Sequence, residues 1–333
     1  MPYSLLRALC ALALGCTACA PDASSPWIYP HDDQLRLHHL QLKGTHNSYH
    51  LEPEAPVYEG HRYSHLSLDR QLDEQGVRVL ELDLHYEGAG APIKILHLGL
   101  VDENTSCSTL KACLRTIKGW SDKHRGHLPI LVWLELKFGV DGAETEVLQD
   151  VERVIEGIFP RDRLLTVDLV KGNHPSLRHA LTNEGWPLLG DIRGRVAFIN
   201  MNSGTAMTNA YLALHPNALG GVLFPNSGTL TQFDEPWAAF TKINDPNSPQ
   251  EIAAALERRI LVASNICLAD FSDAECRQRE EVALSHGVAM LKGDFPAPVD
   301  KRDYWFEFPG GASARCNPLT APEICTPEAI ENL

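Results

Sequence analysis

Short apolar segments with β-strand character recur along the whole chain, separated by stretches of helical or loop character. Helices are expected over residues 66–75 and 144–158, which end near Gly76 and Pro160. The alternation predicts an α/β protein, an irregular (β/α)8 barrel of the TIM type built as a single domain. Nine candidates exceed the eight strands of such a barrel, so at least one is wrong. The candidate strands span residues 37–42, 77–84, 93–98, 129–136, 164–167, 196–200, 220–224, 260–263 and 288–291.

The length and composition fit one elaborated barrel. The chain has 333 residues, and no linker or fixed-period repeat divides it. Its 44% hydrophobic and 22% charged residues provide a packed core and exclude intrinsic disorder. The formal net charge of -14 disfavours nucleic-acid binding and broad adsorption to anionic lipid. We expect the barrel over residues 36–308, after an extension over 21–35 and before a Pro-rich, disulfide-pinned tail over 309–333.

Residues 1–20 have the layout of a secretory signal, with a single charge at Arg7 and an apolar run that is followed by small residues. The run is too short to span a bilayer. Cys16 and Cys19 each resemble the lipidated cysteine of a bacterial lipoprotein, so lipid anchoring and simple cleavage near Ala20 are alternatives. The protein is therefore expected to be exported, either secreted or periplasmic.

Outside this segment six cysteines remain, in three pairs that are close along the chain. Export and an even cysteine count favour disulfides over free buried thiols. Pairing between sequence neighbours is the expected connectivity, and no pair has the spacing of a zinc site with histidines. The expected disulfides are Cys107–Cys113, Cys267–Cys276 and Cys316–Cys325.

Acidic and apolar residues alternate in the second candidate strand. A strand has a side-chain period of two, so Glu81, Asp83 and His85 share one face and the intervening leucines share the other. Parallel strands of a barrel are covered on both sides, and buried carboxylates need partners. A solvent-facing strand is the alternative interpretation, but a hard cation would satisfy two buried acids at once.

Ionisable residues also end the other early strands. The first candidate strand is followed by His46 and Asn47, and the third ends near His97. The fourth brings Glu135 and Lys137 to one face. Barrel enzymes have their active sites at the carboxyl ends of the strands, so we expect these residues to form one site.

An oxygen-only ligand set suits Ca²⁺ or Mg²⁺, whereas zinc would recruit histidines. Calcium is preferred because it tolerates irregular ligand sets and bound water. His46 and His97 then remain available as general base and general acid near neutral pH. Taken alone, either histidine could be a capping or core residue, and Lys137 could be a surface lysine. The expected metal ligands are Asn47, Glu81, Asp83 and Glu135.

Four motifs resemble the catalytic half of phosphatidylinositol-specific phospholipase C, above all its bacterial calcium-dependent branch, and they follow one another along the chain in the same order as in that family. Weaker similarity continues towards the end of the chain. The four motifs are residues 44–49, residues 71–83, His97 and residues 134–136, and the weaker ones are residues 188–196 and 289–294.

The resemblance implies an irregular (β/α)8 barrel, with His46 as general base, His97 as general acid and calcium on the four oxygen ligands. It implies that the inositol 2-hydroxyl attacks the neighbouring phosphodiester, expelling diacylglycerol and leaving a cyclic inositol phosphate. Lys137 and His85 are expected to contact the substrate, a phosphodiester lipid or its soluble head-group analogue. Transient contact with a membrane surface is expected, and no protein partner is inferred.

Three alternatives remain open. Lys292 and Gly293 precede Asp294 where bacterial relatives tend to have Ser-Thr, so the head group could differ. A glycerophosphodiester phosphodiesterase also uses a Glu-x-Asp pair and two histidines, but its His-Arg-Gly triplet precedes the acids, whereas residues 124–126 follow them. An inactive barrel that only binds a ligand is the third possibility. All six matched positions keep competent chemistry, which favours the enzyme.

Overall fold

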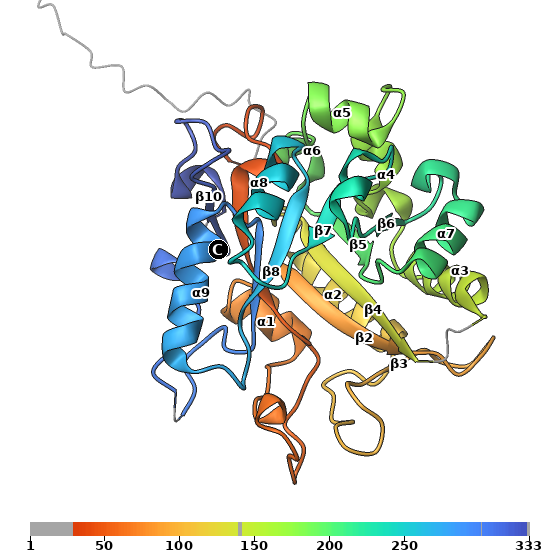
Figure 1. The fold of residues 1–333 in the computed structure, drawn as a ribbon, viewed down its shortest axis with the longest axis vertical. Coiled ribbons are helices and arrows are strands. Elements are labelled where there is room, and N and C mark those ends of the chain that lie inside the picture. Colours follow the sequence, from red (N-terminus) through yellow and green to blue (C-terminus); the bar gives the residue numbers. More distant parts are fainter. Residues whose placement is uncertain (1–28, 139–141, 301, 332–333) are drawn as a thin grey trace, which may run out of the picture.

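The computed structural model, which describes residues 29–138, 142–300 and 302–331, confirms the expected barrel (Figure 1). Eight parallel strands follow one another in the order β6-β5-β4-β2-β1-β9-β8-β7. The ends of this order meet at a parallel bridge between Asn226 and Phe240, so the barrel is nearly closed. The expected export signal over 1–20 and most of the extension over 21–35 lie outside the described residues. The strands are β1 (Leu40–Thr45), β2 (Val79–His85), β4 (Ile130–Phe138), β5 (Val196–Asn200), β6 (Leu223–Pro225), β7 (Phe240–Lys242), β8 (Leu261–Cys267) and β9 (Met290–Gly293).

Helices surround the strands (Figure 1), and α2 (Leu110–Lys123) illustrates why they form. The Thr109 side chain accepts a backbone hydrogen bond in the first turn, and Leu110, Leu114 and Ile117 recur at helical spacing and are buried. The other α-helices are α1 (Leu68–Glu74), α3 (Glu144–Glu156), α4 (Val167–Lys171), α5 (Leu177–Asn183), α6 (Leu189–Ile192), α7 (Thr205–Leu214), α8 (Pro249–Glu257) and α9 (Asp273–Ser285). The short 3-10 helices are η1 (Leu37–His39), η2 (Glu59–His61), η3 (Arg161–Arg163), η4 (Pro216–Ala218), η5 (Leu230–Asp234), η6 (Pro309–Gly311) and η7 (Pro327–Ala329). None of the helices in the described ranges is long and apolar enough to cross a membrane.

Two of the nine expected strands are wrong. Residues 93–98 contribute only β3 (Lys94–Ile95), which pairs antiparallel with the end of β2 and takes no place in the barrel. The connection between β2 and β3 is too short for the crossover that a parallel neighbour needs. Residues 164–167 make one isolated bridge, at Leu164, before α4 begins.

Two short strands, β7 and β10 (Ala314–Cys316), were not expected, because three residues are too few to show an alternating pattern. β10 belongs to the tail and pairs antiparallel with β1. The first expected strand begins later than predicted. Residues 37–39 form η1, and β1 starts at Leu40.

All three expected disulfides are present, which confirms the predicted connectivity. Cys107–Cys113 joins a loop to α2, Cys267–Cys276 joins the end of β8 to α9, and Cys316–Cys325 closes a loop in the tail. Their Cα atoms are 5.2, 4.6 and 6.0 Å apart, within the usual range.

The tail is anchored beneath the barrel by a buried ion pair. Nε of Arg78 lies 2.9 Å from Oε2 of Glu331, and neither side chain is exposed. The same carboxylate accepts hydrogen bonds from the backbone N–H of Leu128 and the hydroxyl of Ser313. Burial opposes the charge on Glu331, but Arg78 and these donors hold the pKa of Glu331 below its ordinary value.

Glu331→Gln is expected to destabilise the protein by about 3 to 5 kcal/mol, because Arg78 would stay buried without a counter-charge. Glu328→Gln, an exposed change in the same tail, should stay within about 0.5 kcal/mol of the parent chain. The lowered pKa means that Glu331 contributes at neutral pH and loses this contribution as the pH falls through that pKa. Urea unfolding at neutral and acidic pH measures both effects, and equal stabilities at neutral pH would contradict the anchor.

Candidate active site

Polar side chains from several strand ends meet at the carboxyl end of the barrel. His46 and Asn47 directly follow β1, and β2 pairs with β4 so that Asp83 lies opposite Glu135. Asp294 follows β9, the other neighbour of β1. Parallel strands bring their carboxyl ends to one end of a barrel, so residues far apart in sequence become neighbours there.

The turn after β1 has two local requirements. A Cβ at Gly44 would lie 2.7 Å from Cβ of Val79 and 3.1 Å from Cγ of Lys292, so only glycine lets β1 pass this closely. Asn47 adopts φ +42°, in the left-handed region that asparagine tolerates. The backbone N–H of His50 closes the turn on the carbonyl of Asn47 at 2.8 Å. These constraints fix the direction in which the turn leaves the strand.

Glu81, Asp83 and Glu135 form an oxygen-rich cluster, with one carboxylate oxygen of each within 4.8 Å of the others. Oδ1 of Asn47 and both oxygens of Asp83 are buried, yet they accept no hydrogen bond of good geometry among the described residues. Burial raises the pKa of Asp83 to about 6, against the opposing charge of Lys137. Buried oxygens with so few well-placed hydrogen bonds are what a hard cation would satisfy, so this donor set fits calcium.

Lys137 lies between two of the expected metal ligands. Its Nζ is 3.3 Å from Oδ2 of Asp83 and 3.3 Å from Oε2 of Glu135. Burial would lower the pKa of Lys137, but the two carboxylates outweigh it and raise that pKa. The lysine is thus part of the cluster and not a surface residue beyond the strand.

Glu81 is held by two further lysines that had no predicted role. Nζ of Lys242 is 3.4 Å from Oε1 of Glu81, and Lys292 forms an ion pair with Oε2. Burial opposes the charge on Glu81, but the two lysines keep its pKa well below the ordinary value. Lys292 is fully buried, its ammonium lies 5.6 Å from the ring centre of Trp133, and burial lowers its pKa to about 8. Ligation of a metal by Glu81 stays a prediction.

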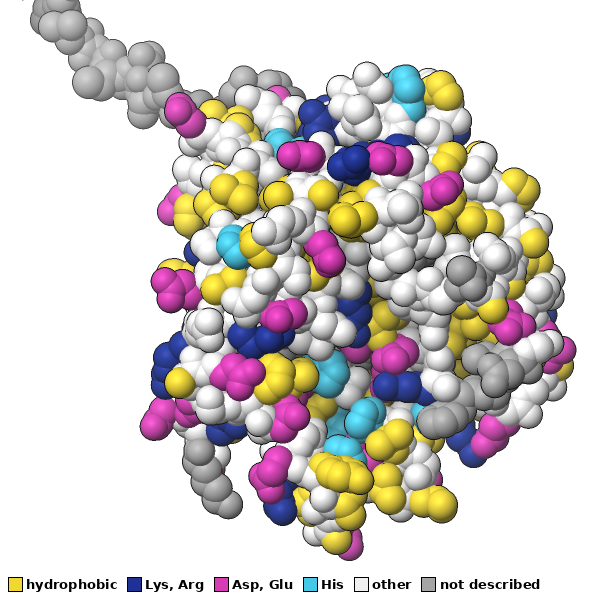
Figure 2. Space-filling model, in the orientation of Figure 1, with side chains coloured by type: hydrophobic (Ala, Val, Ile, Leu, Met, Phe, Trp, Pro, Cys, Tyr) yellow, Lys and Arg dark blue, Asp and Glu magenta, His cyan; other side chains and the backbone are white. Residues whose placement is uncertain are grey.

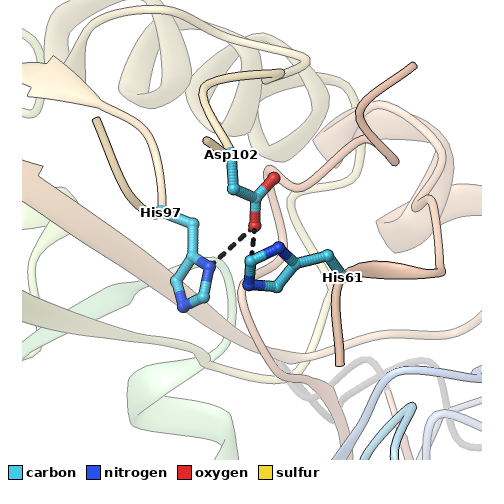
Figure 3. Close-up of side chains that lie close together, drawn as sticks. All are labelled: His61, His97 and Asp102. Carbon is cyan, nitrogen blue, oxygen red and sulfur yellow. Dashed lines mark hydrogen bonds and ion pairs between the residues drawn. The ribbon is translucent and has the colours of Figure 1, made fainter. Parts of the chain in front are cut away.

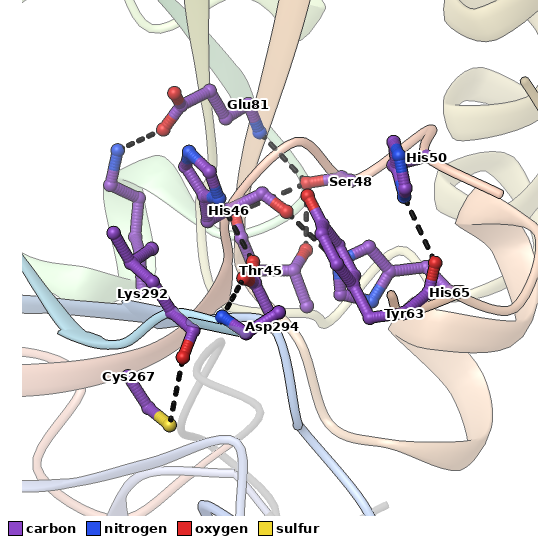
Figure 4. Close-up of polar contacts among 12 residues, drawn as sticks. Thr45, His46, Ser48, His50, Tyr63, His65, Glu81, Cys267, Lys292 and Asp294 are labelled. Atoms are coloured by element: carbon purple, nitrogen blue, oxygen red, sulfur yellow. Dashed lines mark hydrogen bonds and ion pairs between the residues drawn. The ribbon is translucent and has the colours of Figure 1, made fainter. Parts of the chain in front are cut away.

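His46 is paired with Asp294 (Figure 4). Nδ1 of His46 donates to Oδ1 of Asp294 at 2.9 Å, and Oδ2 of Asp294 accepts the backbone N–H of Ala269 at 2.7 Å. Nε2 of His65 donates to the carbonyl of His46 at 2.8 Å. Burial would lower the pKa of His46, but the charge and hydrogen bond of Asp294 raise it above the ordinary value. The imidazole is held in one orientation with its proton on Nδ1, because a carboxylate only accepts.

His97 lies in the loop after β3 and is paired with Asp102 (Figure 3). Its Nδ1 donates to Oδ2 of Asp102 at 2.7 Å, and 21% of the His97 side chain is exposed, whereas Asp102 is fully buried. His50 and His61 also surround this carboxylate. Among the described residues no hydrogen bond or ring contact joins His97 to the His46 pair, so the two histidine roles stay predictions.

A cavity of about 360 Å³ opens beside the carboxylate cluster, and Glu135, Met201 and Met207 are part of its lining. Nζ of Lys242 lies 2.9 Å from Sδ of Met201, so a positive charge contacts one residue of this lining. His85 is half-buried at the end of β2 and interacts with the backbone of the loop that follows β3. Its expected contact with substrate stays a prediction.

The pairing partners of the two histidines had no predicted role. Asp294 is 248 residues from His46 in the sequence, and only the closure of the barrel makes β9 a neighbour of β1. The position of Asp294 just after the last expected strand was the sequence feature that could have indicated a place in the site. Asp102 follows His97 by five residues and could have been found by its proximity. Lys242 ends β7, a strand too short to be expected.

A family model described as calcium-dependent phosphoinositide phospholipase C matches residues 35–92 and 86–318 of the chain. An uncharacterised protein of Mycobacterium tuberculosis is 36% identical over 135 residues. The match covers 37% of this chain and only 27% of the length of that relative.

Two solved structures share the fold. A calcium-dependent phosphoinositol-specific phospholipase C from a Gram-negative Pseudomonas species has a TM-score of 0.62 at 18% identity, with 87% of this chain and 98% of that chain covered. A Ca²⁺-dependent phosphatidylinositol-specific phospholipase C from Streptomyces antibioticus has a TM-score of 0.58 at 19% identity, with 78% and 95% covered. One structure of the Pseudomonas protein is a myo-inositol complex.

Asp83→Asn is expected to weaken calcium binding by about tenfold or more, because it neutralises a buried acceptor at the centre of the cluster. Glu156→Gln alters a carboxylate in a solvent-exposed ion pair with Arg161 and should leave calcium binding unchanged. Isothermal titration with calcium alone compares the two variants with the parent protein. Equal calcium affinity in Asp83→Asn would place the cation elsewhere.

Proposed function

Because this chain belongs to the calcium-dependent phosphoinositide phospholipase C family, we propose that it is a calcium-dependent phosphodiesterase acting on a phosphoinositide-type lipid. The observation that carries the proposal is the His46–Asp294 pair beside the oxygen cluster at the mouth of the barrel. The pair can accept a proton, and the cluster can hold a cation beside the reacting phosphate. The myo-inositol complex of the Pseudomonas relative supports an inositol head group.

His46 is proposed as the general base. Asp294 holds the Nδ1 proton, which leaves the lone pair of the neutral ring on Nε2. That nitrogen would take the proton of the inositol 2-hydroxyl while the hydroxyl oxygen forms its bond to phosphorus. Asp294 would then stabilise the imidazolium that results.

His97 is proposed as the general acid. Asp102 fixes its Nδ1 proton, so Nε2 would carry the proton that passes to the glycerol oxygen as the bond between phosphorus and that oxygen breaks. Diacylglycerol would leave, and the cyclic inositol phosphate would remain. The partial exposure of His97 supports this role, because a substrate at the barrel mouth can reach it.

Asn47, Glu81, Asp83 and Glu135 are the proposed holders of the cation. Bound calcium would lower the pKa of the attacking hydroxyl and stabilise the negative charge on a phosphate oxygen. Lys137 and Lys242 border the same space and are proposed to add positive charge for the phosphodiester. Lys292 is buried where the resemblance leads us to expect a small polar residue, so the choice of head group is the part of the proposal to test first.

An apolar rim beside the site supports action at a membrane surface. We define this rim as Val57, Tyr58, Leu100 and Val101, which lie in the loops after β1 and β3. Leu100 is 97% exposed and Tyr58 67% exposed. Figure 2 shows histidine side chains gathered at the lower end of the molecule, with hydrophobic side chains just below them. Shallow insertion of this rim into a membrane would bring a lipid head group to the mouth of the barrel. The three disulfides support export, so the enzyme would meet lipid outside the cytoplasm.

His46→Ala and His97→Ala are each expected to lower turnover of phosphatidylinositol by about 10²-fold or more, because each removes one proton transfer. His124→Ala serves as the control, because His124 directly follows α2 and precedes β4, away from the carboxyl end of that strand. Since His124 begins the His-Arg-Gly triplet, the same variant tests the glycerophosphodiesterase alternative. Products are identified with calcium or a chelator present. A cyclic inositol phosphate supports the proposal, and release of glycerol phosphate or full activity in His46→Ala contradicts it.

Leu100→Ser is expected to reduce binding to phosphatidylinositol vesicles, and turnover on them, by about tenfold, because it removes the most exposed apolar side chain of the rim. Turnover of a soluble head-group analogue should be unchanged. Leu319→Ser removes another exposed leucine, in the tail, and should affect neither measurement. Vesicle co-sedimentation and the two activity assays decide the matter, and equal losses on both substrates would argue against membrane contact.

A further inference from the structure

A second cluster of ligand-type side chains lies beside the oxygen cluster. His61, His97 and Asp102 come from η2, from the loop after β3 and from the turn that follows it (Figure 3). One ligand atom of each lies within 4.8 Å of the others. Nε2 of His61 is 3.7 Å from Oδ2 of Asp102, and Nδ1 of His97 is 2.7 Å from the same oxygen. Two imidazoles and one carboxylate thus point at a common position.

His50 supports this carboxylate from the other side. Nδ1 of His50 lies 3.0 Å from the carbonyl of Tyr63, and its Nε2 lies 2.9 Å from Oδ1 of Asp102. The Tyr63 carbonyl and the Asp102 carboxylate are both hydrogen-bond acceptors, so His50 links this carboxylate to the backbone. Asp102 is therefore held in one orientation although it is fully buried. A carboxylate fixed in this way by an outer histidine is typical of metal sites.

His61 is the residue that hydrogen bonding does not explain. Its side chain is only 5% exposed, yet its Nδ1 has no hydrogen-bond partner among the described residues. Its Nε2 is too far from Asp102 for a hydrogen bond and still points towards it. A buried imidazole without hydrogen bonds is costly to keep, and a metal ion bound to Nε2, the nitrogen that faces the carboxylate, would give this ring one strong partner.

From this arrangement we propose that His61, His97 and Asp102 form a zinc-type transition-metal site, separate from the oxygen cluster. Two histidines and one carboxylate with a further position for water are a common zinc ligand set, whereas calcium selects oxygen ligands. Binding releases the Nδ1 proton of His97 to solvent, because the ligating nitrogen must give up its hydrogen. Oδ1 of Asp102 keeps its contact with His50.

The site connects metal binding to catalysis through His97. Its partly exposed ring gives an ion from solvent a path to the buried carboxylate. An ion on Nδ1 keeps the ring of His97 neutral, and the Nε2 proton of a neutral imidazole is far less acidic than that of an imidazolium, so zinc inhibits the enzyme while calcium supports it. This inhibition rests on the proposed function, whereas zinc binding itself does not.

Zinc alone is the probe for the test. The purified protein is titrated with zinc in excess calcium, which keeps the oxygen cluster filled, and the cobalt form is examined by visible absorption for a low-coordinate histidine site. His61→Gln is the main variant, because His61 makes no side-chain hydrogen bond that its loss would break. His174→Gln is the matched control, since His174 contacts His179 and Glu184 at the surface and could also attract zinc.

We expect one tight zinc site per chain, weakened by about tenfold or more in His61→Gln and unchanged in His174→Gln. Inhibition of each variant by zinc, relative to its own zinc-free rate, should follow the same order. Should His61→Gln fail to fold, His97→Gln in the binding assay takes its place. Unchanged zinc affinity in the folded variant, or loss of the tight site in His174→Gln instead, overturns the proposal. Zinc binding without any phospholipase activity would refute the proposed function and leave the metal site standing.

Discussion

The site depends on one buried ion cluster in the barrel interior, in which Glu81 of β2 meets Lys242 of β7 and Lys292 of β9. Taking three charges out of water is costly, and the cost is offset only where partners and hydrogen bonds are well placed. Here the cluster joins alternate strands of the barrel, because only β1 lies between β2 and β9 and only β8 lies between β9 and β7. The backbone of Glu81 also exchanges hydrogen bonds with Ser48, in the turn that carries His46. The orientation of His46, the proposed general base, is therefore tied to the same interior cluster that faces the proposed cation site.

Charge balance explains how the mouth of the barrel tolerates so many ionised groups. Three carboxylates of the oxygen cluster face three lysines, so neither sign is in excess before a ligand arrives. A dication alone would leave surplus positive charge, and a phosphodiester anion alone would leave surplus negative charge. Joint arrival of the two leaves a single surplus positive charge, which would stabilise the second negative charge that develops on the phosphate during the reaction. Each histidine is meanwhile oriented by an acid of its own, Asp294 or Asp102.

Residue patterns predicted the barrel and most of the oxygen cluster, because a period of two specifies which face a strand side chain occupies. Asp83 and Glu135 were expected on that basis and do lie opposite each other on paired strands. The prediction was wrong where an apolar run was too close to its neighbour for a crossover, as at residues 93–98, and His97 consequently lies in a loop. It assigned no role to Asp294, because the contact of Asp294 with His46 depends on closure of the barrel. It assigned none to Lys242, because Lys242 belongs to a strand of only three residues. Tertiary pairing of that kind leaves no periodic signal.

The attachment of the tail has a consequence for how the chain reaches this structure. β1 lies between β2, β9 and β10, and Arg78 is joined to Glu331 across 253 residues. Native contacts of such long sequence separation impose a large loop-closure entropy before they stabilise anything, which slows folding. The early strands therefore lack part of their hydrogen bonding, and Arg78 lacks its partner, until β9, β10 and Glu331 have been synthesised. Assembly is a late, chain-length-dependent event, and nascent intermediates expose β1 as an open edge that needs protection from aggregation until then.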